Sequence, residues 1–441
     1  MHTLKFVIFS AFISVSMTLL NAEDPYVFNE WKVTYGTMSP LGIPQQVILI
    51  NGKFPGPVIN CTSNNNILVN VFNNLDEPFL LTWNGVQHRK NSWVDGTPAT
   101  MCPIQPGTNF TYKFQVKDQI GTYYYFPTTA LHRAAGGIGV LQVHSRPLIP
   151  VPFDNPADEF AVVVGDWFKK GHRSMKDLLD GGKSIGRPDG LHINGKAAQV
   201  GAPAEPSWTF EAGKTYRFRF CNAGMRTSVN FRFQGHDMKL VELEGSHLMQ
   251  DMYMSMDLHV GQCMSVLVDA DQPPKDYYLV VTSRFTKTLL TTVATIRYTG
   301  GNGPASPELP PPPPENTLGV AWSINQFRTF RWNLTASAAR PNPQEPGRWS
   351  PEKRKNYNLE DAVSRHTVPV FPGCWAAVML TLDNAGMWSL RSEMWERFYL
   401  GQQLYFSVLS PEKSLRDEYN LPETSLLCGV VSNLPRPAPY V

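Results

Sequence analysis

The chain has 441 residues, which is too long for one hydrophobic core and predicts two or three domains. Lys and Arg number 39 against 37 Asp and Glu, so the charge balance gives no support to binding of nucleic acid or of an anionic membrane surface. Only 17% of the residues are charged, whereas glycine, proline and aromatic residues are plentiful, and this composition favours an all-β protein.

Residues 1–22 have the features of a cleaved secretory signal peptide. A basic Lys5 precedes an apolar run, and the small residue Ala22 precedes the polar Glu23. An uncleaved membrane helix is the alternative, but the run is short and strand-like sequence follows it. We therefore expect secretion to the extracellular space, meaning the apoplast or cell wall, and no membrane span, because no second apolar stretch follows.

A first β-rich unit is expected over residues 23–146. Its strand-length apolar or alternating runs lie at 32–38, 45–52, 66–73, 109–116 and 139–145. Turn clusters such as NGKFPGP and DGTP separate these runs, a pattern typical of a β-sandwich or barrel.

A similar series begins again over residues 147–299. The runs in this unit lie at 159–167, 214–224, 238–246, 265–270 and 276–283. The segments QPGTNFTYKF (105–114) and EAGKTYRFRF (211–220) occupy comparable places in the two units. This weak similarity suggests two copies of one β-sandwich.

A proline-rich linker is expected at residues 300–316, because five consecutive prolines cannot join a sheet and form an extended spacer. Beyond it, residues 317–441 contain only three convincing strand segments, HTVPVF, CWAAVMLTLDN and QQLYFSVLS. The third unit is therefore predicted to be incomplete, with exposed apolar faces and poor secretion as consequences.

Secretion would make the six cysteines candidates for disulfides, although six cysteines allow 15 pairings. Cys221 and Cys263 lie on strand-like segments of one unit and are plausible partners. Three glycosylation sequons begin at Asn60, Asn109 and Asn333 and predict a glycoprotein.

Several long motifs resemble the multicopper oxidase superfamily, and within it the plant SKU-similar proteins, also described as pollen-type ascorbate oxidase homologues. The motifs that carry the resemblance are INGKFPGPVIN (50–60), TWNGVQHRKNSWVDG (82–96), CPIQPGTNFTYKFQV (102–116), GTYYYFPTTALHRAAGGIGVLQV (121–143), VVGDWF (163–168), NGKA (194–197), VELEGSH (241–247), LTLDNAGMW (380–388) and WERFYLGQQLYFSV (395–408). The resemblance implies tandem cupredoxin-like Greek-key β-sandwiches, here two complete and a third truncated. It also implies a disulfide between Cys102 and Cys428, while Cys61 and Cys374 stay unassigned.

The family's first copper motifs are histidine pairs, and this chain has other residues at the matching positions. His-Trp-His-Gly corresponds to Thr82-Trp83-Asn84-Gly85, and the second pair of histidines corresponds to Phe126 and Thr128. Neither a hydroxyl nor an amide replaces imidazole as a strong copper ligand, and phenylalanine offers no donor atom.

The C-terminal copper motif is also altered. Arg391, Ser392 and Glu393 stand where the resemblance expects His, Cys and His, Arg397 stands at the next histidine, and Gln402 lies roughly at the axial position. A His-Pro-x-His-x-His-Gly segment is missing from the third unit, and no two of the ten histidines are spaced i, i+2. We therefore expect no catalytic residue and no metal, with copper only if the family-level expectation holds.

Other candidate residues are given structural roles. His88 is expected to be solvated on a loop. His132 with Arg133 could line the vacated copper region, but a solvated or hydrogen-bonded pair is the favoured interpretation. Asp166 and Asp383 are expected to make turn and strand-end hydrogen bonds. The methionine-rich segment 249–264 offers a Cu(I) site at Met252, Met254 and Met256 with His259 and Cys263, but packing is the favoured interpretation.

The sequence thus predicts a secreted, non-catalytic relative of the oxidases. The resemblance implies a cell-wall or apoplastic role in directional or tip growth, including pollen tubes, with cell-wall or apoplastic components as partners. Two alternatives stay open: a copper-dependent oxidoreductase of the L-ascorbate oxidase type, and a methionine-based Cu(I) binding or transfer protein.

Overall fold

The computed structural model describes residues 25–202, 205–331, 344–359, 362–410 and 425–435. The predicted signal peptide and the Asn333 sequon lie outside these residues. Within the described ranges, every helix is too short or too polar to cross a membrane.

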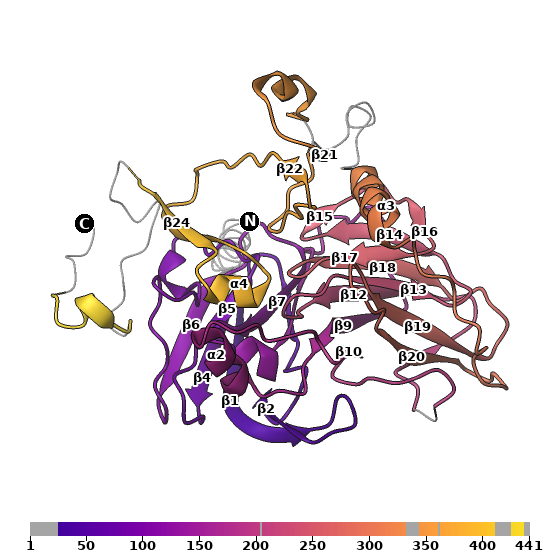
Figure 1. The fold of residues 1–441 in the computed structure, drawn as a ribbon, viewed down its shortest axis with the longest axis horizontal. Helices are drawn as coiled ribbons and strands as arrows, with labels where there is room; N and C mark the ends of the chain where they lie inside the picture. Colours follow the sequence, from indigo (N-terminus) through magenta and orange to yellow (C-terminus); the bar gives the residue numbers. More distant parts are fainter. Residues whose placement is uncertain (1–24, 203–204, 332–343, 360–361, 411–424, 436–441) are drawn as a thin grey trace, which may run out of the picture.

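The first unit is a β-sandwich of two four-stranded sheets (Figure 1). One sheet has the order β2-β1-β4-β6, with β1 (Tyr26–Met38), β2 (Gln45–Ile50), β4 (Asn66–Asn73) and β6 (Asn109–Gln115). The other has the order β3-β8-β7-β5, with β3 (Ile59–Thr62), β5 (Leu81–Asn84), β7 (Gly121–Pro127) and β8 (Gly139–His144). Trp31 on β1 packs against Trp83 on β5 with 5.7 Å between ring centroids, so a shared core joins the sheets.

The second unit is a larger sandwich. Its first sheet contains β9 (Asp158–Trp167), β10 (Gly190–Ile193), β12 (Thr215–Asn222), β14 (Met238–Leu243), β15 (Ser246–His247), β16 (Met252–Tyr253) and β18 (Cys263–Asp269). Its second sheet contains β11 (Trp208–Phe210), β13 (Val229–Phe233), β17 (Met256–Leu258), β19 (Asp276–Ser283) and β20 (Thr291–Tyr298). Phe220 and Phe231 stack across the two sheets with centroids 4.0 Å apart. The predicted all-β class with two sandwiches is confirmed.

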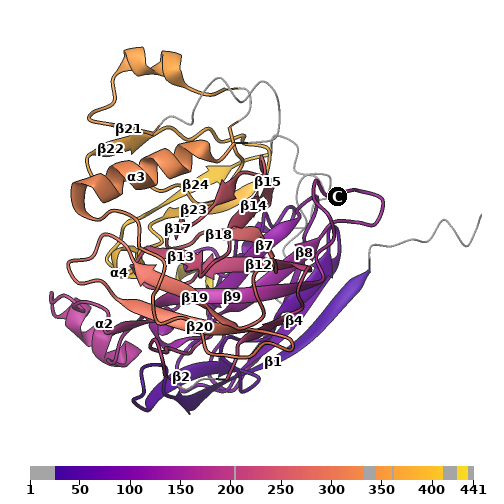
Figure 2. The same cartoon turned by 90° about the vertical axis from the view of Figure 1, so that its right-hand side faces the viewer.

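Helices are few, and the three α-helices of the described residues pack against the sandwiches. They are α2 (His172–Asp180), α3 (Asn316–Thr329) and α4 (Trp395–Tyr399), with 3-10 turns η1 (Ser92–Val94), η2 (His132–Ala135), η4 (Pro351–Asn356) and η5 (Gly429–Val431). The sequence analysis did not predict α3. Figure 2 shows this helix beside the second sandwich, and its Phe327 joins that sandwich's core.

The proline-rich linker is not a free spacer. Arg232 Nε donates to Pro310 O at 2.8 Å, and Arg284 Nη1 donates to Pro314 O at 2.7 Å. The linker therefore lies along the second sandwich. Because α3 also packs there, packing assigns residues up to the end of α3 to the second unit, beyond the boundary predicted at residue 299.

The third unit is small in the described residues. It contains the pairs β21 (Gln344–Pro346) with β22 (Cys374–Ala376) and β23 (Gly386–Arg391) with β24 (Gln403–Val408). Figures 1 and 2 show these orange and yellow segments gathered along one side of the two sandwiches.

Two strand predictions in the third unit were wrong. HTVPVF (366–371) forms no strand, and in CWAAVMLTLDN (374–384) only β22 does. Pro369 lacks the backbone donor that a strand ladder needs. Met379 and Leu380 are 74% and 58% exposed, so no sheet formed by the described residues covers this apolar segment.

Both expected disulfides are present. Cys102 is bonded to Cys428, which ties the first sandwich to the C-terminal segment. Cys221 and Cys263 are bonded across the paired strands β12 and β18. Cys61 is a buried free thiol and Cys374 a half-buried one.

Candidate functional site

The candidate site lies where the two sandwiches and α4 meet. A buried cluster there combines Phe126 of β7, Val163 of β9, Met175 of α2 and Trp395 of α4. Phe126 is fully buried and meets Trp395 edge to face, with ring centroids 5.1 Å apart. Phe126 is therefore a core residue of the interface.

Two of the candidate residues, Thr82 and Thr128, hold the loop that crosses the end of β5. Thr82 Oγ1 donates to Asp95 O at 2.7 Å, and Thr128 Oγ1 donates to Gly96 O at 2.6 Å. Gly96 has φ +69°, and a Cβ there would lie 1.6 Å from Leu81 O, so only glycine fits. Both hydroxyls are committed to backbone carbonyls.

A buried ion-pair cluster fills the centre of the site. Glu393 accepts from Arg133 Nη1 at 3.0 Å and from Arg391 Nε at 3.3 Å. Tyr124 OH donates to the same carboxylate at 3.4 Å. The Arg133 guanidinium also lies over the Phe126 ring, 4.1 Å from its centroid. The guanidiniums of Arg133 and Arg391 therefore hold the Glu393 carboxylate beside the aromatic residues of the interface.

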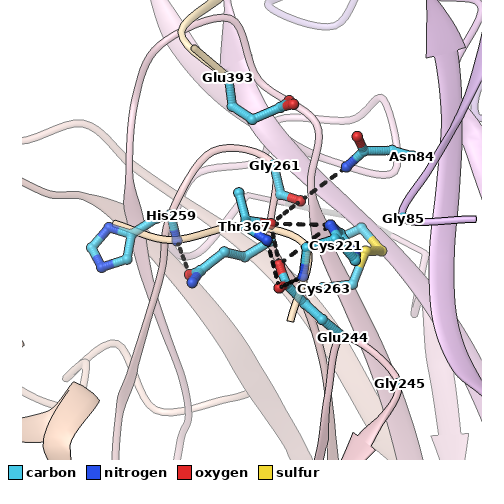
Figure 3. Close-up of polar contacts among 12 residues, drawn as sticks. Asn84, Gly85, Cys221, Glu244, Gly245, His259, Gly261, Cys263, Thr367 and Glu393 are labelled. Carbon is cyan, nitrogen blue, oxygen red and sulfur yellow. Dashed lines mark hydrogen bonds and ion pairs between the residues drawn. A yellow bond between two sulfur atoms is a disulfide. The ribbon is translucent and has the colours of Figure 1, made fainter. Parts of the chain in front are cut away.

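Asn84 joins this cluster to the second sandwich. Its Oδ1 accepts from Arg391 Nη2 at 3.0 Å, and its Nδ2 donates to Gly261 O at 3.3 Å. Figure 3 shows the Asn84 amide directed at Gly261, with Glu393 close by. A Cβ at Gly261 would meet Glu393 Cγ at 2.5 Å, so the acidic side chain packs directly on this glycine.

A segment of the third unit closes the same region. The backbone N–H groups of His366 and Thr367 donate to Glu244 Oε2 at 3.0 and 2.9 Å. Thr367 Oγ1 donates to Gly261 O at 3.2 Å, as Figure 3 shows. A Cβ at Gly85 would lie 2.3 Å from His366 Cδ2. Residues 366 and 367 thus fit tightly between the two sandwiches.

The two guanidiniums keep the Glu393 carboxylate charged. Burial raises the pKa of Glu393, but the nearby Arg391 and Arg133 guanidiniums outweigh that effect and hold its pKa below the ordinary value. The carboxylate is therefore ionised at neutral pH and shared by two cations.

The remaining C-terminal candidates lie apart from this cluster. Ser392 donates its backbone N–H to Gln402 O at 3.0 Å. Arg397 lies on the exposed side of α4. The structure thus brings together Asn84, Phe126, Arg391 and Glu393, but leaves Arg397 outside.

The favoured interpretation of Arg133, as a solvated or hydrogen-bonded pair with His132, did not place it in this cluster, although a position lining the vacated copper region was the alternative. Arg133 is 2% exposed. Its partner Glu393 lies 260 residues away in the chain, and no local pattern signals such a pair.

The expectation of a solvated His88 was wrong. The residue is 2% exposed, and neither ring nitrogen has a hydrogen-bond partner among the described residues. Its ring packs edge to face on Phe114 with centroids 5.2 Å apart. Burial lowers the pKa of His88 to about 3, so the ring is neutral at physiological pH.

The methionine segment is not assembled into a sulfur site. Met252 and Met254 are exposed, whereas Met256 is buried in the second core. Cys263 is used in a disulfide, and His259 Nδ1 lies 3.0 Å from Ser228 Oγ.

Of the two lone carboxylates, Asp166 makes the expected strand-end hydrogen bonds, whereas Asp383 forms an ion pair that was not predicted. Asp166 accepts from the N–H of Met225 at 2.6 Å and from Thr227 Oγ1 at 2.6 Å. Asp383 forms a surface ion pair with Arg89 at 3.1 Å. The two described sequon residues, Asn60 and Asn109, are both exposed.

Comparison with known proteins gives the same family along the whole chain. Multicopper oxidase models match residues 32–148, 158–301 and 338–414. An L-ascorbate oxidase homolog of Nicotiana tabacum is 59% identical over 532 residues, covering 95% of this chain and 96% of that protein. Since 532 exceeds the 441 residues of this chain, the tobacco protein carries residues that have no counterpart here.

Two further matches extend the comparison. The monocopper oxidase-like protein SKU5 of Arabidopsis thaliana is 36% identical, covering 99% of this chain and 95% of that one. A laccase from Botrytis aclada shares the fold, with a TM-score of 0.68 at 18% identity and 89% coverage of both chains. The chain belongs to the multicopper oxidase family.

Proposed function

We propose that this protein is a secreted, non-catalytic member of the multicopper oxidase family, a pseudo-oxidase in which an ion-pair cluster replaces the copper site. The observation that carries the proposal is the Arg133–Glu393–Arg391 cluster, which lies between Asn84 and Phe126. These are the positions that the sequence motifs match to copper ligands from two different domains.

The residues at these positions do not fit copper. Copper sites of this family need imidazole and thiolate donors. The side chains present are an amide whose oxygen accepts from Arg391, a phenylalanine, and a carboxylate bound by two guanidiniums. Thr82 and Thr128 direct their hydroxyls at backbone carbonyls.

The charges at these positions also disfavour copper. Two guanidiniums are held within hydrogen-bonding distance of Glu393, and neither can lose its charge at physiological pH. A copper ion placed here would meet two fixed positive charges against one negative charge. The cluster instead serves as a polar joint that fixes α4 and β23 to both sandwiches.

The leader-like residues 1–22, the two exposed sequons and the two disulfides support the proposed extracellular location. The proposed role in directional or tip growth, including pollen tubes, rests on the resemblance to SKU-similar proteins alone. Cell-wall or apoplastic components would be its partners.

The test uses the purified secreted protein after exposure to copper. We expect no blue absorption band and no oxygen consumption with ascorbate or a phenol. The L-ascorbate oxidase of Cucumis sativus, which is 25% identical to this chain, provides the positive control. Oxygen consumption that depends on copper would establish the oxidase alternative.

The Cu(I) alternative has less structural support. Met256 faces the hydrophobic core while Met252 and Met254 face outwards, so the three thioethers do not converge. Cu(I) binding that is lost on substitution of all three methionines would establish it.

A further inference from the structure

A second cluster, made of side chains that commonly bind metal ions, lies elsewhere between the two sandwiches. Glu77 precedes β5, His132 begins η2, and His172 begins α2, so the first two belong to the first sandwich and the third to the second. His132 Nε2 lies 2.6 Å from Glu77 Oε2, and His172 Nε2 lies 3.4 Å from the same oxygen. One ligand atom from each residue lies within 4.8 Å of the others.

The cluster is mostly buried, but solvent has access to part of it. The side chain of His132 is fully buried, that of His172 is 5% exposed and that of Glu77 is 25% exposed. The two imidazole rings meet edge to face with centroids 5.2 Å apart. Solvent therefore reaches the carboxylate while the imidazoles are fixed by packing.

The donor atoms suit a cation. His132 Nε2, His172 Nε2 and a carboxylate oxygen of Glu77 converge on one point. Two imidazoles and one carboxylate are the donor set that Zn²⁺ uses with a water molecule as fourth ligand.

We propose that Glu77, His132 and His172 form a binding site for a divalent transition-metal ion of the Zn²⁺ type, which joins the first sandwich to α2 of the second.

The geometry allows a metal ion to replace the existing hydrogen bond. His132 Nδ1 has no hydrogen-bond partner among the described residues, so no second bond fixes the proton on Nε2. Transfer of that proton to Nδ1 frees the Nε2 lone pair for the ion. The site does not use the residues of the Arg133 cluster, because the neighbouring Arg133 side chain is bound to Glu393 instead.

Arg173 is the competitor for the carboxylate. Its guanidinium pairs with both Glu77 and Asp76, and its side chain is 48% exposed. It can therefore turn away from Glu77 when an ion binds, and the 66% exposed Asp76 and the Tyr35 hydroxyl, at 3.4 Å, stay available as partners. Removal of this positive charge should strengthen metal binding.

The experiment titrates the full-length secreted protein, first stripped with a chelator, with Zn²⁺ in a calorimeter. The wild type should bind about one ion. His132→Gln and His172→Gln should each weaken binding by at least about tenfold, because even residues outside the metal shell contribute that much to affinity. His247→Gln, a half-buried histidine on β15, is the matched control and should bind as the wild type does.

Arg173→Gln gives the second arm and does not depend on folding of a buried variant. It should tighten Zn²⁺ binding by roughly tenfold, from loss of a unit charge beside the ion. Near-ultraviolet circular dichroism checks that each variant is folded. If a histidine variant does not fold, the wild-type stoichiometry and the Arg173→Gln affinity decide.

Three results would overturn the proposal. They are no saturable Zn²⁺ binding by the folded wild type, wild-type affinity in both histidine variants, and unchanged or weaker binding in Arg173→Gln.

Discussion

Arg133 and Glu393 form a buried ion pair, with 3.0 Å between Nη1 and Oε2, although 260 residues separate them in the chain. Arg133 lies in η2, the 3-10 turn that follows β7, and Glu393 follows β23 of the third unit. The pair therefore connects the first sandwich to the segment that carries α4. Its position, beside Phe126 and Asn84, is the reason for regarding the region as a structural joint.

Glu393→Gln should lower the free energy of unfolding by about 3 kcal/mol, because it leaves two buried guanidiniums without an anion. Chemical denaturation followed by tryptophan fluorescence measures the change. Asp383→Asn removes one partner of an exposed ion pair and should cost less than about 1 kcal/mol. Equal losses in the two variants would contradict the buried role of Glu393.

Restoring imidazoles at two first-domain positions should not restore copper. In Asn84→His with Phe126→His, the Arg133 and Arg391 guanidiniums stay in place and repel the ion. The double variant should also lose stability, because Phe126 packs on Trp395 in the interface core. Elemental analysis of the folded variant and of the wild type checks the first expectation, and more copper in the variant than in the wild type would refute it.

His88 should make the protein sensitive to acid. Its folded pKa of about 3 lies below the ordinary value, so the unfolded chain binds the proton more readily. The stability contribution is complete above pH 6.5 and is lost as the pH falls toward 3, at roughly 1.4 kcal/mol per pH unit.

His88→Leu should remove this sensitivity, because the site is apolar and neither ring nitrogen has a described partner. Thermal melting at pH 7 and pH 5 measures the effect. The wild type should lose more of its melting temperature than the variant between these values. Parallel losses would show that His88 does not carry the acid sensitivity.

The third unit should limit secretion. Met379, Leu380 and Leu382 are 74%, 58% and 65% exposed, which leaves apolar surface for aggregation or quality control to recognise. A version carrying the residues that the tobacco relative has and this chain lacks should be secreted in higher yield. Quantification of soluble, disulfide-bonded protein from both versions is the measurement, and equal yields would argue against an incomplete domain.

Much of the fold was predictable from the sequence. The runs at 66–73 and 276–283 match β4 and β19 residue for residue, because their strand periodicity is strong and turn residues bound them. The third unit was less predictable. The apolar run at 374–384 has strand composition, but strands form only against partners, and most of this run has none.

Some residues of the candidate site were also predictable from the sequence, and others were not. The family resemblance matches Asn84, Phe126, Arg391 and Glu393 to copper-ligand positions. The structure brings the side chains of these four residues together. The roles of Arg133, His88 and Glu77 depend on contacts between distant segments. No local pattern reports such contacts, so only the three-dimensional arrangement identifies them.

The most direct test of the central claim is the copper content of the secreted wild-type protein after incubation with copper and removal of the excess by dialysis. We predict no blue absorption band and at most one bound copper ion per chain, because the proposed Glu77, His132 and His172 site would also take Cu²⁺. Three or four tightly bound copper ions with a blue band would contradict it.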